Sequence, residues 1–175
     1  MINLLKKIKS EQTLCEIYSS NGGSDTFTVG FVYDYDDDFY ILECVSPDGR
    51  WDGFQCRETE DITMIRQDTP CINALKKLMP FYNFYHKEID AEGKNVLETM
   101  LRYIQKNKKI CRIETYRDSG VSGTVIDASQ NAVAVSLVNG GGQSVGTGYL
   151  LKEDIDFISV DSEDEVRLEI LSKQQ

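Results

Sequence analysis

The sequence predicts a mainly β protein with helices, built of two tandem small five-stranded barrels that are each preceded by a helix. Three observations predict this fold class. Short runs of apolar and β-branched residues alternate with turn residues at close spacing, which favours small barrels over open sheets. The pattern occurs twice, over residues 30–66 and again over residues 123–160. An amphipathic helical pattern precedes each copy.

The two copies align at a fixed offset. Shifting the first copy by 93 residues superposes identical residues, among them the pairs Gly30 and Gly123, Asp34 and Asp127, Gly49 and Gly142, and Ile65 and Ile158. Upstream, an offset of 96 residues pairs Cys15 with Cys111. The difference of three falls in a loop, where a change of length costs little. Matches at one spacing predict an internal duplication.

The duplication predicts three segments in a chain of 175 residues, which has room for two small domains. Residues 1–67 hold the first helix and barrel. Residues 68–94 form a helical and aromatic linker. Residues 95–175 hold the second helix and barrel together with a C-terminal tail helix.

In the first copy, a helix is expected over residues 2–10, where Leu5 and Ile8 share one face. Five strands are expected to follow, at residues 13–18, 27–35, 39–45, 51–57 and 61–65. Thr69 and Pro70 then provide the N-cap and first position of a helix that we expect to end at Pro80.

In the second copy, Asn95 is the expected N-cap of the leading helix, and Glu98 completes a box-like N-terminus. Five strands are expected at residues 110–115, 122–127, 132–138, 144–150 and 155–160. Ser162 and Glu165 form a capping box for the tail helix.

Gly123, Asp127 and Asn131 carry a family resemblance. The Asp-x-x-x-Asn spacing, the glycine in the second strand and the leading helix together resemble the Sm-like proteins, an SH3-like small-barrel family. The resemblance implies association through strand edges and binding of single-stranded RNA near the turn residues. In the first copy Asp38 replaces the motif asparagine, within an acidic run at residues 34–38 that disfavours RNA there.

The charge of the chain argues against nucleic acid as its main partner. The net charge is −10, and both halves are acidic. Proteins that bind nucleic acid usually show a basic footprint. The leading hypothesis is therefore a non-enzymatic binding or assembly module that associates with protein partners or with itself through strand edges. DNA is not an expected partner.

RNA binding by the second barrel is the alternative. Its expected residues are those of the turn motif and the basic residues near the end of the leading helix: Asp127, Asn131, Lys106, Lys108, Lys109 and Arg112. These basic residues could form a local patch in an otherwise acidic chain.

A partner-binding site is expected at Arg50 and Trp51, which flank a turn in the first copy only. Tryptophan and arginine are enriched at binding hot spots. The structural interpretation is that Trp51 packs over its own barrel end. The aromatic run at residues 81–86 could stack bases or dock a partner, but the interpretation we favour is that it seals the interface between the barrels.

Neither catalysis nor a cofactor or metal ion is expected. The acidic run at 34–38 is not an EF-hand loop, because Phe39 and Val45 occupy its sixth and twelfth positions. It is interpreted as a solvated acidic turn. His86 is the only histidine, and no serine or cysteine lies in a nucleophile motif.

The remaining features indicate a cytoplasmic protein. No apolar run approaches the ~20 residues of a membrane helix, so no membrane partner is expected. The N-terminal residues do not resemble a signal peptide. Five cysteines without paired spacing are typical of a reduced compartment.

Overall fold

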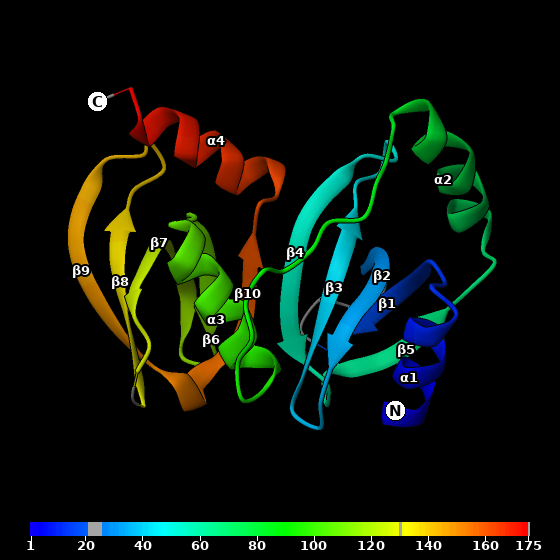
Figure 1. Ribbon diagram of the computed structural model, residues 1–175, viewed down its shortest axis with the longest axis horizontal. Coiled ribbons are helices and arrows are strands. Elements are labelled where there is room, and N and C mark those ends of the chain that lie inside the picture. The colour runs from blue at the N-terminus through cyan, green and yellow to red at the C-terminus, as the bar shows by residue number, and fades with distance from the viewer. Residues whose placement is uncertain (21–25, 130, 175) are drawn as a thin grey trace. The chain divides into compact units, whose positions relative to one another are not determined.

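The computed structural model describes residues 1–20, 26–129 and 131–174 (Figure 1). The chain divides into two compact units, Met1–Glu88 and Ile89–Gln175, which we call the first half and the second half. The predicted limits of 1–67, 68–94 and 95–175 stay a prediction.

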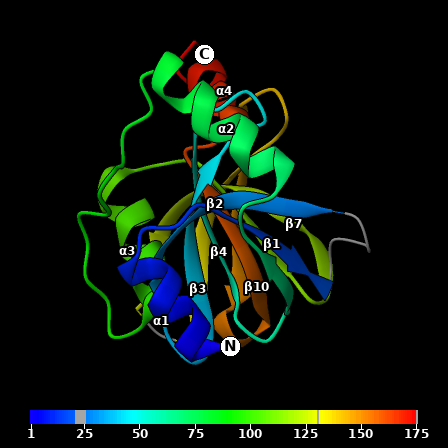
Figure 2. The ribbon, with the colours of Figure 1, turned by 90° about the vertical axis from the view of Figure 1, so that its right-hand side faces the viewer.

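The first half contains two helices and five strands. They are α1 (Ile2–Ser10), β1 (Cys15–Ser19), β2 (Phe27–Tyr35), β3 (Phe39–Val45), β4 (Trp51–Glu58), β5 (Ile62–Arg66) and α2 (Pro70–Phe81). Antiparallel ladders give the strand order β5-β1-β2-β3-β4. Both helices lie in front of these strands in Figure 2. Leu5 and Ile8 of α1 are buried among strand residues, as their spacing predicts.

The second half repeats this sequence of elements. They are α3 (Val96–Asn107), β6 (Cys111–Thr115), β7 (Asp118–Asp127), β8 (Ala132–Val138), β9 (Ser144–Leu151), the short 3-10 helix η2 (Lys152–Asp154), β10 (Ile155–Val160) and α4 (Glu163–Ser172). Its strand order is β10-β6-β7-β8-β9, again with antiparallel ladders.

The predicted fold class is wrong. In each half the five strands form an open antiparallel arrangement, β5-β1-β2-β3-β4 and β10-β6-β7-β8-β9, and among the described residues its first and last strands do not pair with each other, so neither half is the separate five-stranded barrel that was predicted. In place of a barrel preceded by a helix, each half is an open set of strands with one helix before it and another after it. Short connections between strands occur in open antiparallel sheets as well as in barrels. The connection lengths in the sequence therefore do not show whether the first and last strands pair to close a barrel.

Several individual elements agree with their predicted limits. The strands expected at 27–35, 39–45, 132–138 and 155–160 have these bounds. The N-caps are confirmed: the Thr69 hydroxyl accepts the Ile72 N–H at 3.2 Å, and the Asn95 amide oxygen accepts the Glu98 N–H at 2.8 Å. Helix α2 runs one residue past Pro80, the expected end.

The helix that follows the strands of the first half is part of its core. Ile72 and Leu75 of α2 are buried against Leu14, Val29 and Val45. This apolar stripe, spaced as a helix requires, fixes α2 on the strands. The segment expected to be a linker therefore contributes side chains to the core of the first half.

Glycines in β2 and β7 show the same close approach in both halves. A Cβ atom on Gly30 would lie 2.3 Å from the Glu43 carbonyl oxygen, and one on Gly123 would lie 2.2 Å from that of Ser136. Glu43 and Ser136 are themselves 93 residues apart. The sequence offset thus relates backbone contacts as well as residue types.

The turn glycines correspond in the same way. Gly49 and Gly142 have positive φ angles of +86° and +76°, a conformation that glycine adopts without strain. A Cβ atom on Gly49 would lie 2.7 Å from Leu78 Cβ in α2. A Cβ atom on Gly142 would lie 2.7 Å from the Ser172 nitrogen in α4. In each half, the turn before the fourth strand contacts the helix that follows the fifth.

Candidate functional site

The structure brings Arg50 and Trp51 together with the aromatic segment that follows α2. The Arg50 guanidinium carbon lies 4.7 Å from the centroid of the Tyr82 ring. The Lys87 ammonium lies 3.5 Å from the centroid of a Trp51 ring and 5.8 Å from that of Tyr85. These are cation–π distances. We define the aromatic–cation surface as Arg50, Trp51, Phe81, Tyr82, Tyr85 and Lys87.

Much of this surface is aromatic and open to solvent. Phe81 is 78% exposed and Tyr85 is 65% exposed. The Phe81 and Tyr82 rings make an edge contact with their centroids 5.2 Å apart. Trp51 is half-buried and packs edge-on against Phe54 at 5.6 Å. Large exposed rings gathered in one place are typical of binding sites.

A buried carboxylate lies under the aromatic–cation surface. Glu43 in β3 is 2% exposed. One of its oxygens accepts the Trp51 indole N–H at 3.0 Å and the Lys87 backbone N–H at 2.7 Å. The other lies 2.6 Å from Nδ1 of His86. Because a buried carboxylate requires hydrogen-bond donors, Glu43 holds two parts of the surface in place.

The aromatic segment has an inner and an outer side. Phe84 packs against the apolar cluster of the first half, and the His86 ring contacts both Phe31 and Phe84, with centroids 4.7 Å and 5.5 Å away. Phe81 and Tyr85 are exposed instead. The predicted role of this segment in sealing an interface stays a prediction.

Sequence reasoning missed Glu43 and Lys87. Glu43 had a visible signal, because it is the only charged residue of β3. A charge inside an apolar strand requires a buried partner. Lys87 had no such signal, since its position over Trp51 depends on the path of the chain after α2.

The charge at the turn is partly compensated. The Arg50 side chain makes an ion pair of 2.9 Å with Asp48. A hydrogen bond from the Ser46 hydroxyl, with a smaller effect of Arg50, lowers the pKa of the Asp48 carboxyl. Asp48 therefore pairs with Arg50 as an ionised carboxylate, whereas none of the ion pairs among the described residues involves Lys87.

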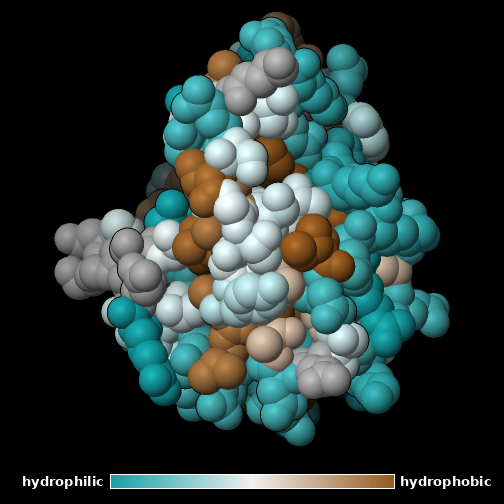
Figure 3. All heavy atoms as spheres, turned by 90° about the vertical axis from the view of Figure 1, so that its left-hand side faces the viewer, coloured by the Kyte–Doolittle hydropathy of each residue, from teal (hydrophilic) through white to brown (hydrophobic). Residues whose placement is uncertain are grey.

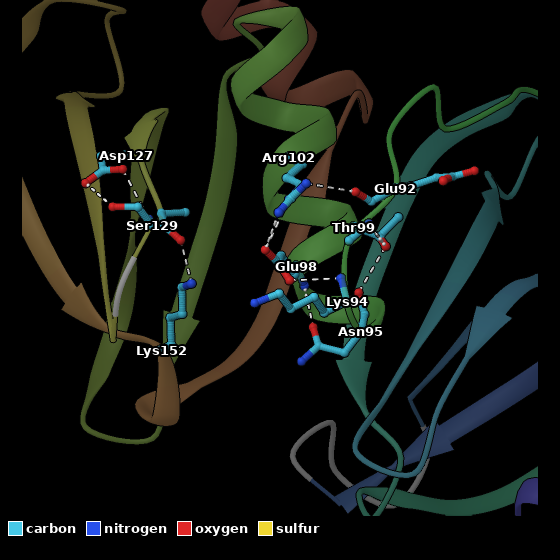
Figure 4. Close-up of polar contacts among 11 residues, drawn as sticks. Glu92, Lys94, Asn95, Glu98, Thr99, Arg102, Asp127, Ser129 and Lys152 are labelled. Carbon is cyan, nitrogen blue, oxygen red and sulfur yellow. Dashed lines mark hydrogen bonds and ion pairs between the residues drawn. The ribbon is translucent and has the colours of Figure 1, made fainter.

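The predicted RNA residues of the second half lie around a different feature. A hollow of about 600 Å³ is lined by residues of α3 and of the turn after β7, including Lys106 and Asp127. Figure 4 shows Asp127 and Ser129 on one side of it and α3 on the other. The Asp127 carboxylate accepts the Ser129 N–H at 3.1 Å and its hydroxyl at 3.0 Å. Asp127 thus stabilises its own turn.

The charges that line this hollow balance. Lys94, Arg102 and Lys106 are its cations, and Glu92, Glu98 and Asp127 are its carboxylates. Arg102 donates to Glu98 at 2.7 Å on α3, as Figure 4 shows. Hydrogen bonds from the Lys94 N–H and then from Arg102 lower the pKa of Glu98. The lining is therefore not a continuous basic groove.

Most of the predicted basic residues are paired with carboxylates. The ion pairs are Lys106 with Asp90 at 2.8 Å, Lys109 with Asp161 at 2.7 Å, and Arg112 with Glu114 at 2.6 Å. Burial lowers the pKa of Lys109, but its hydrogen bond to Asp161 and that carboxylate's charge outweigh burial and raise it. Lys108 caps α3 in a left-handed conformation and is exposed.

Asn131 has a structural contact through its backbone. It is exposed, and its carbonyl oxygen accepts the Lys152 N–H at 2.8 Å. The Lys152 ammonium in turn donates to the Ala128 carbonyl at 2.5 Å (Figure 4). Of the six predicted RNA residues, the structure brings Asp127 and Lys106 to the same hollow.

Comparisons of the chain with protein-family models, with curated proteins and with solved structures found no match. Within residues 1–20, 26–129 and 131–174, no helix has the length and apolar character needed to cross a membrane. The same ranges contain no group of three or more His, Cys, Asp or Glu side chains that could hold a metal ion. Function therefore has to be inferred from the surfaces of the chain itself.

Proposed function

We propose that the protein is a non-enzymatic binding module, and that its aromatic–cation surface binds a protein segment with apolar and acidic side chains. The observation that carries the proposal is the gathering of exposed aromatic rings around Trp51 and Lys87, both hydrogen-bonded to buried Glu43.

The composition of this surface is that of a binding hot spot. Tryptophan, tyrosine and arginine contribute most of the energy at many protein interfaces. Two of the rings, Phe81 and Tyr85, are mostly in water in the free chain, so covering them would be favourable. Trp51 is held by its indole hydrogen bond to Glu43, so less side-chain freedom is lost on binding.

The cations favour acidic groups in the partner. Arg50 and Lys87 lie over aromatic rings, in a chain whose net charge is −10. Acidic side chains of a partner would pair with these two local cations and not with the acidic remainder of the surface. Binding should therefore weaken as salt rises.

A protein segment fits this surface better than RNA does. RNA affinity depends on cations that neutralise successive phosphates. The surface has two cations, and Arg50 is already paired with Asp48. The predicted RNA residues Lys106, Lys109 and Arg112 are also paired with carboxylates.

Peptide selection tests the proposal. A library of displayed random peptides would be selected against the wild-type chain and against the double variant Phe81→Ser, Tyr85→Ser. We expect the wild type to enrich peptides with apolar and acidic residues, and the double variant to lose them. Tyr116→Ser is the matched control, because Tyr116 is an exposed ring outside the aromatic–cation surface. Enrichment that survives the double variant would overturn the proposal.

An RNA assay separates the alternative. Fluorescence anisotropy with short U-rich and A-rich RNA, at low and at physiological salt, would be measured for the wild type and for Asn131→Ala. We expect no binding at physiological salt. Salt-sensitive binding that weakens in Asn131→Ala would instead support RNA recognition by the second half.

A further inference from the structure

The fourth strand of the second half lies at the end of the sheet. β9 ends the strand order, and of the strands in the described ranges only β8 pairs with it. The ladder runs from Ala132 opposite Leu151 to Val138 opposite Ser144. An edge strand presents backbone N–H and C=O groups that can pair with another strand.

This edge has no protecting charge. Residues 128–151 contain no Asp, Glu, Lys, Arg or His, in a chain in which charged residues make up 27%. Natural edge strands commonly carry charges or proline that prevent pairing with other chains. The corresponding strand of the first half, β4, contains Asp52, Arg57 and Glu58.

Apolar side chains on β9 face solvent. Tyr149 is 76% exposed, and Val145 and Leu151 are also exposed. Figure 3 shows the side on which β9 lies in Figure 1, where pale and brown spheres gather in the middle of the face and teal spheres border it. An exposed, uncharged and partly apolar edge is a site of association.

We propose that β9 pairs with β9 of a second copy of this chain, antiparallel and about a two-fold axis at Tyr149. The distribution of charge along the chain favours β9 as the place of this contact. Two copies with a net charge of −10 repel each other, and an uncharged strand lets them meet without opposing like charges. A two-fold interface places the same patch on both copies.

The sequence of β9 suits this register. Thr147 would lie opposite Leu151 of the second copy, and Tyr149 opposite Tyr149. Aromatic and β-branched cross-strand pairs of this kind stabilise antiparallel sheets. At the other end, a register shift beside Leu137 leaves Val145 without a partner on β8. That irregularity limits the added ladder to the part of β9 after Val145.

The oligomeric state tests the pairing. Sedimentation equilibrium over a wide range of concentrations should give a mass approaching twice the 19.9 kDa of one chain. Tyr149→Lys places like charges at the axis and should give the single-chain mass. Tyr116→Lys adds the same charge at another exposed tyrosine and should leave the dimer intact. A wild type that stays monomeric, or that forms open-ended assemblies, would overturn the proposal.

Cross-linking tests the register. In a Cys71→Ser background, which removes the exposed cysteine, single cysteines would replace Thr147, Tyr149 or Leu151. Only the cysteine at 149 would face itself, within the distance that a disulfide can bridge. Two cysteines at 147 would lie about 13 Å apart along the strands. We expect disulfide dimers mainly from Tyr149→Cys, and preferential cross-linking at 147 or 151 would contradict this axis. Neither experiment involves the aromatic–cation surface, so either proposal can fail alone.

Discussion

The two halves share their backbone contacts but differ in the side chains that face outward. Gly30 and Gly123 approach the neighbouring strand in the same way, and Gly49 and Gly142 contact the following helix in the same way. Outward positions diverge. Trp51, over which Lys87 lies, corresponds at the offset of 93 to Ser144.

The divergence extends to the positions that carry the two proposals. Buried Glu43, which anchors the aromatic–cation surface, corresponds to Ser136. In the other direction, exposed Leu151 of β9 corresponds to the charged Glu58 of β4. Packing fixes the shared backbone contacts, whereas positions outside those contacts, both buried and exposed, differ between the halves. The differences between the halves therefore indicate where each half binds.

The largest expected difference between the halves is at Glu43. Glu43→Ala leaves the Trp51 indole N–H and the Lys87 N–H without their acceptor, so we expect the free energy of unfolding to fall by about 3 kcal/mol. Ser136→Ala, at the corresponding position, should cost well under half as much. Urea denaturation measures both. Equal losses would mean that Glu43 has no special anchoring role.

The turn glycines should behave alike in the two halves. Gly49→Ala and Gly142→Ala each force a Cβ atom against a helix at a positive φ angle, so each should lower the free energy of unfolding by about 2 kcal/mol. Gly146→Ala is the control. Its φ angle is +108°, but its Cβ atom would meet nothing within 4 Å, so the loss should be about 1 kcal/mol. Losses in the free energy of unfolding that differ strongly between Gly49→Ala and Gly142→Ala would contradict the view that the two turns contact their helices in the same way.

Removing the exposed rings should change binding without changing stability. Phe81→Ser with Tyr85→Ser removes side chains that are mostly in water, so the free energy of unfolding should stay within about 0.5 kcal/mol of the wild type. A larger loss, measured by the same denaturation, would indicate that these rings stabilise the first half and are not kept for binding.

The smallest expected effect is the pH dependence of the stability that Glu98 contributes at the N-terminus of α3. The pKa of Glu98 in α3 is lowered, chiefly by the Lys94 N–H, whereas α1 has no acidic residue in its first turn. A lowered pKa means that Glu98 stabilises the fold above its ordinary value of 4.5 and loses this effect as pH falls through its folded pKa. The stability difference between wild type and Glu98→Gln should therefore shrink on acidification. A difference that stays constant in urea midpoints across this pH range would contradict the assignment.

The local elements were predictable because their signals are local. Short, mostly apolar runs between turn residues marked β3 and β8, and capping residues marked the starts of α2 and α3. The arrangement of strands was not predictable, because closure depends on which edges pair. The packing of α2 into the core of the first half was not predicted. A signal for it was present, because the offset of 93 residues pairs Thr69, the N-cap of α2, with Ser162, the N-cap of α4.

The candidate sites were predictable only in part. Arg50 and Trp51 stood out because they occur in one copy. Their proximity to Tyr82 and Lys87 depends on how the segment after α2 returns to the strands. The predicted basic patch of the second half rested on residue type and on position near the end of the leading helix. Pairing of Lys109 with Asp161 joins residues far apart in the chain, which no local pattern reports.

The most direct test of the account is an amide NMR titration of the wild-type chain with an acidic, apolar peptide enriched in the selection described above. The account predicts shifts at Arg50, Trp51 and the segment from Phe81 to Lys87, with weaker binding as salt rises. It also predicts that Phe81→Ser with Tyr85→Ser abolishes these shifts while Tyr116→Ser does not. Shifts centred on β9 or on the hollow beside α3 would contradict the central claim that the partner-binding surface belongs to the first half.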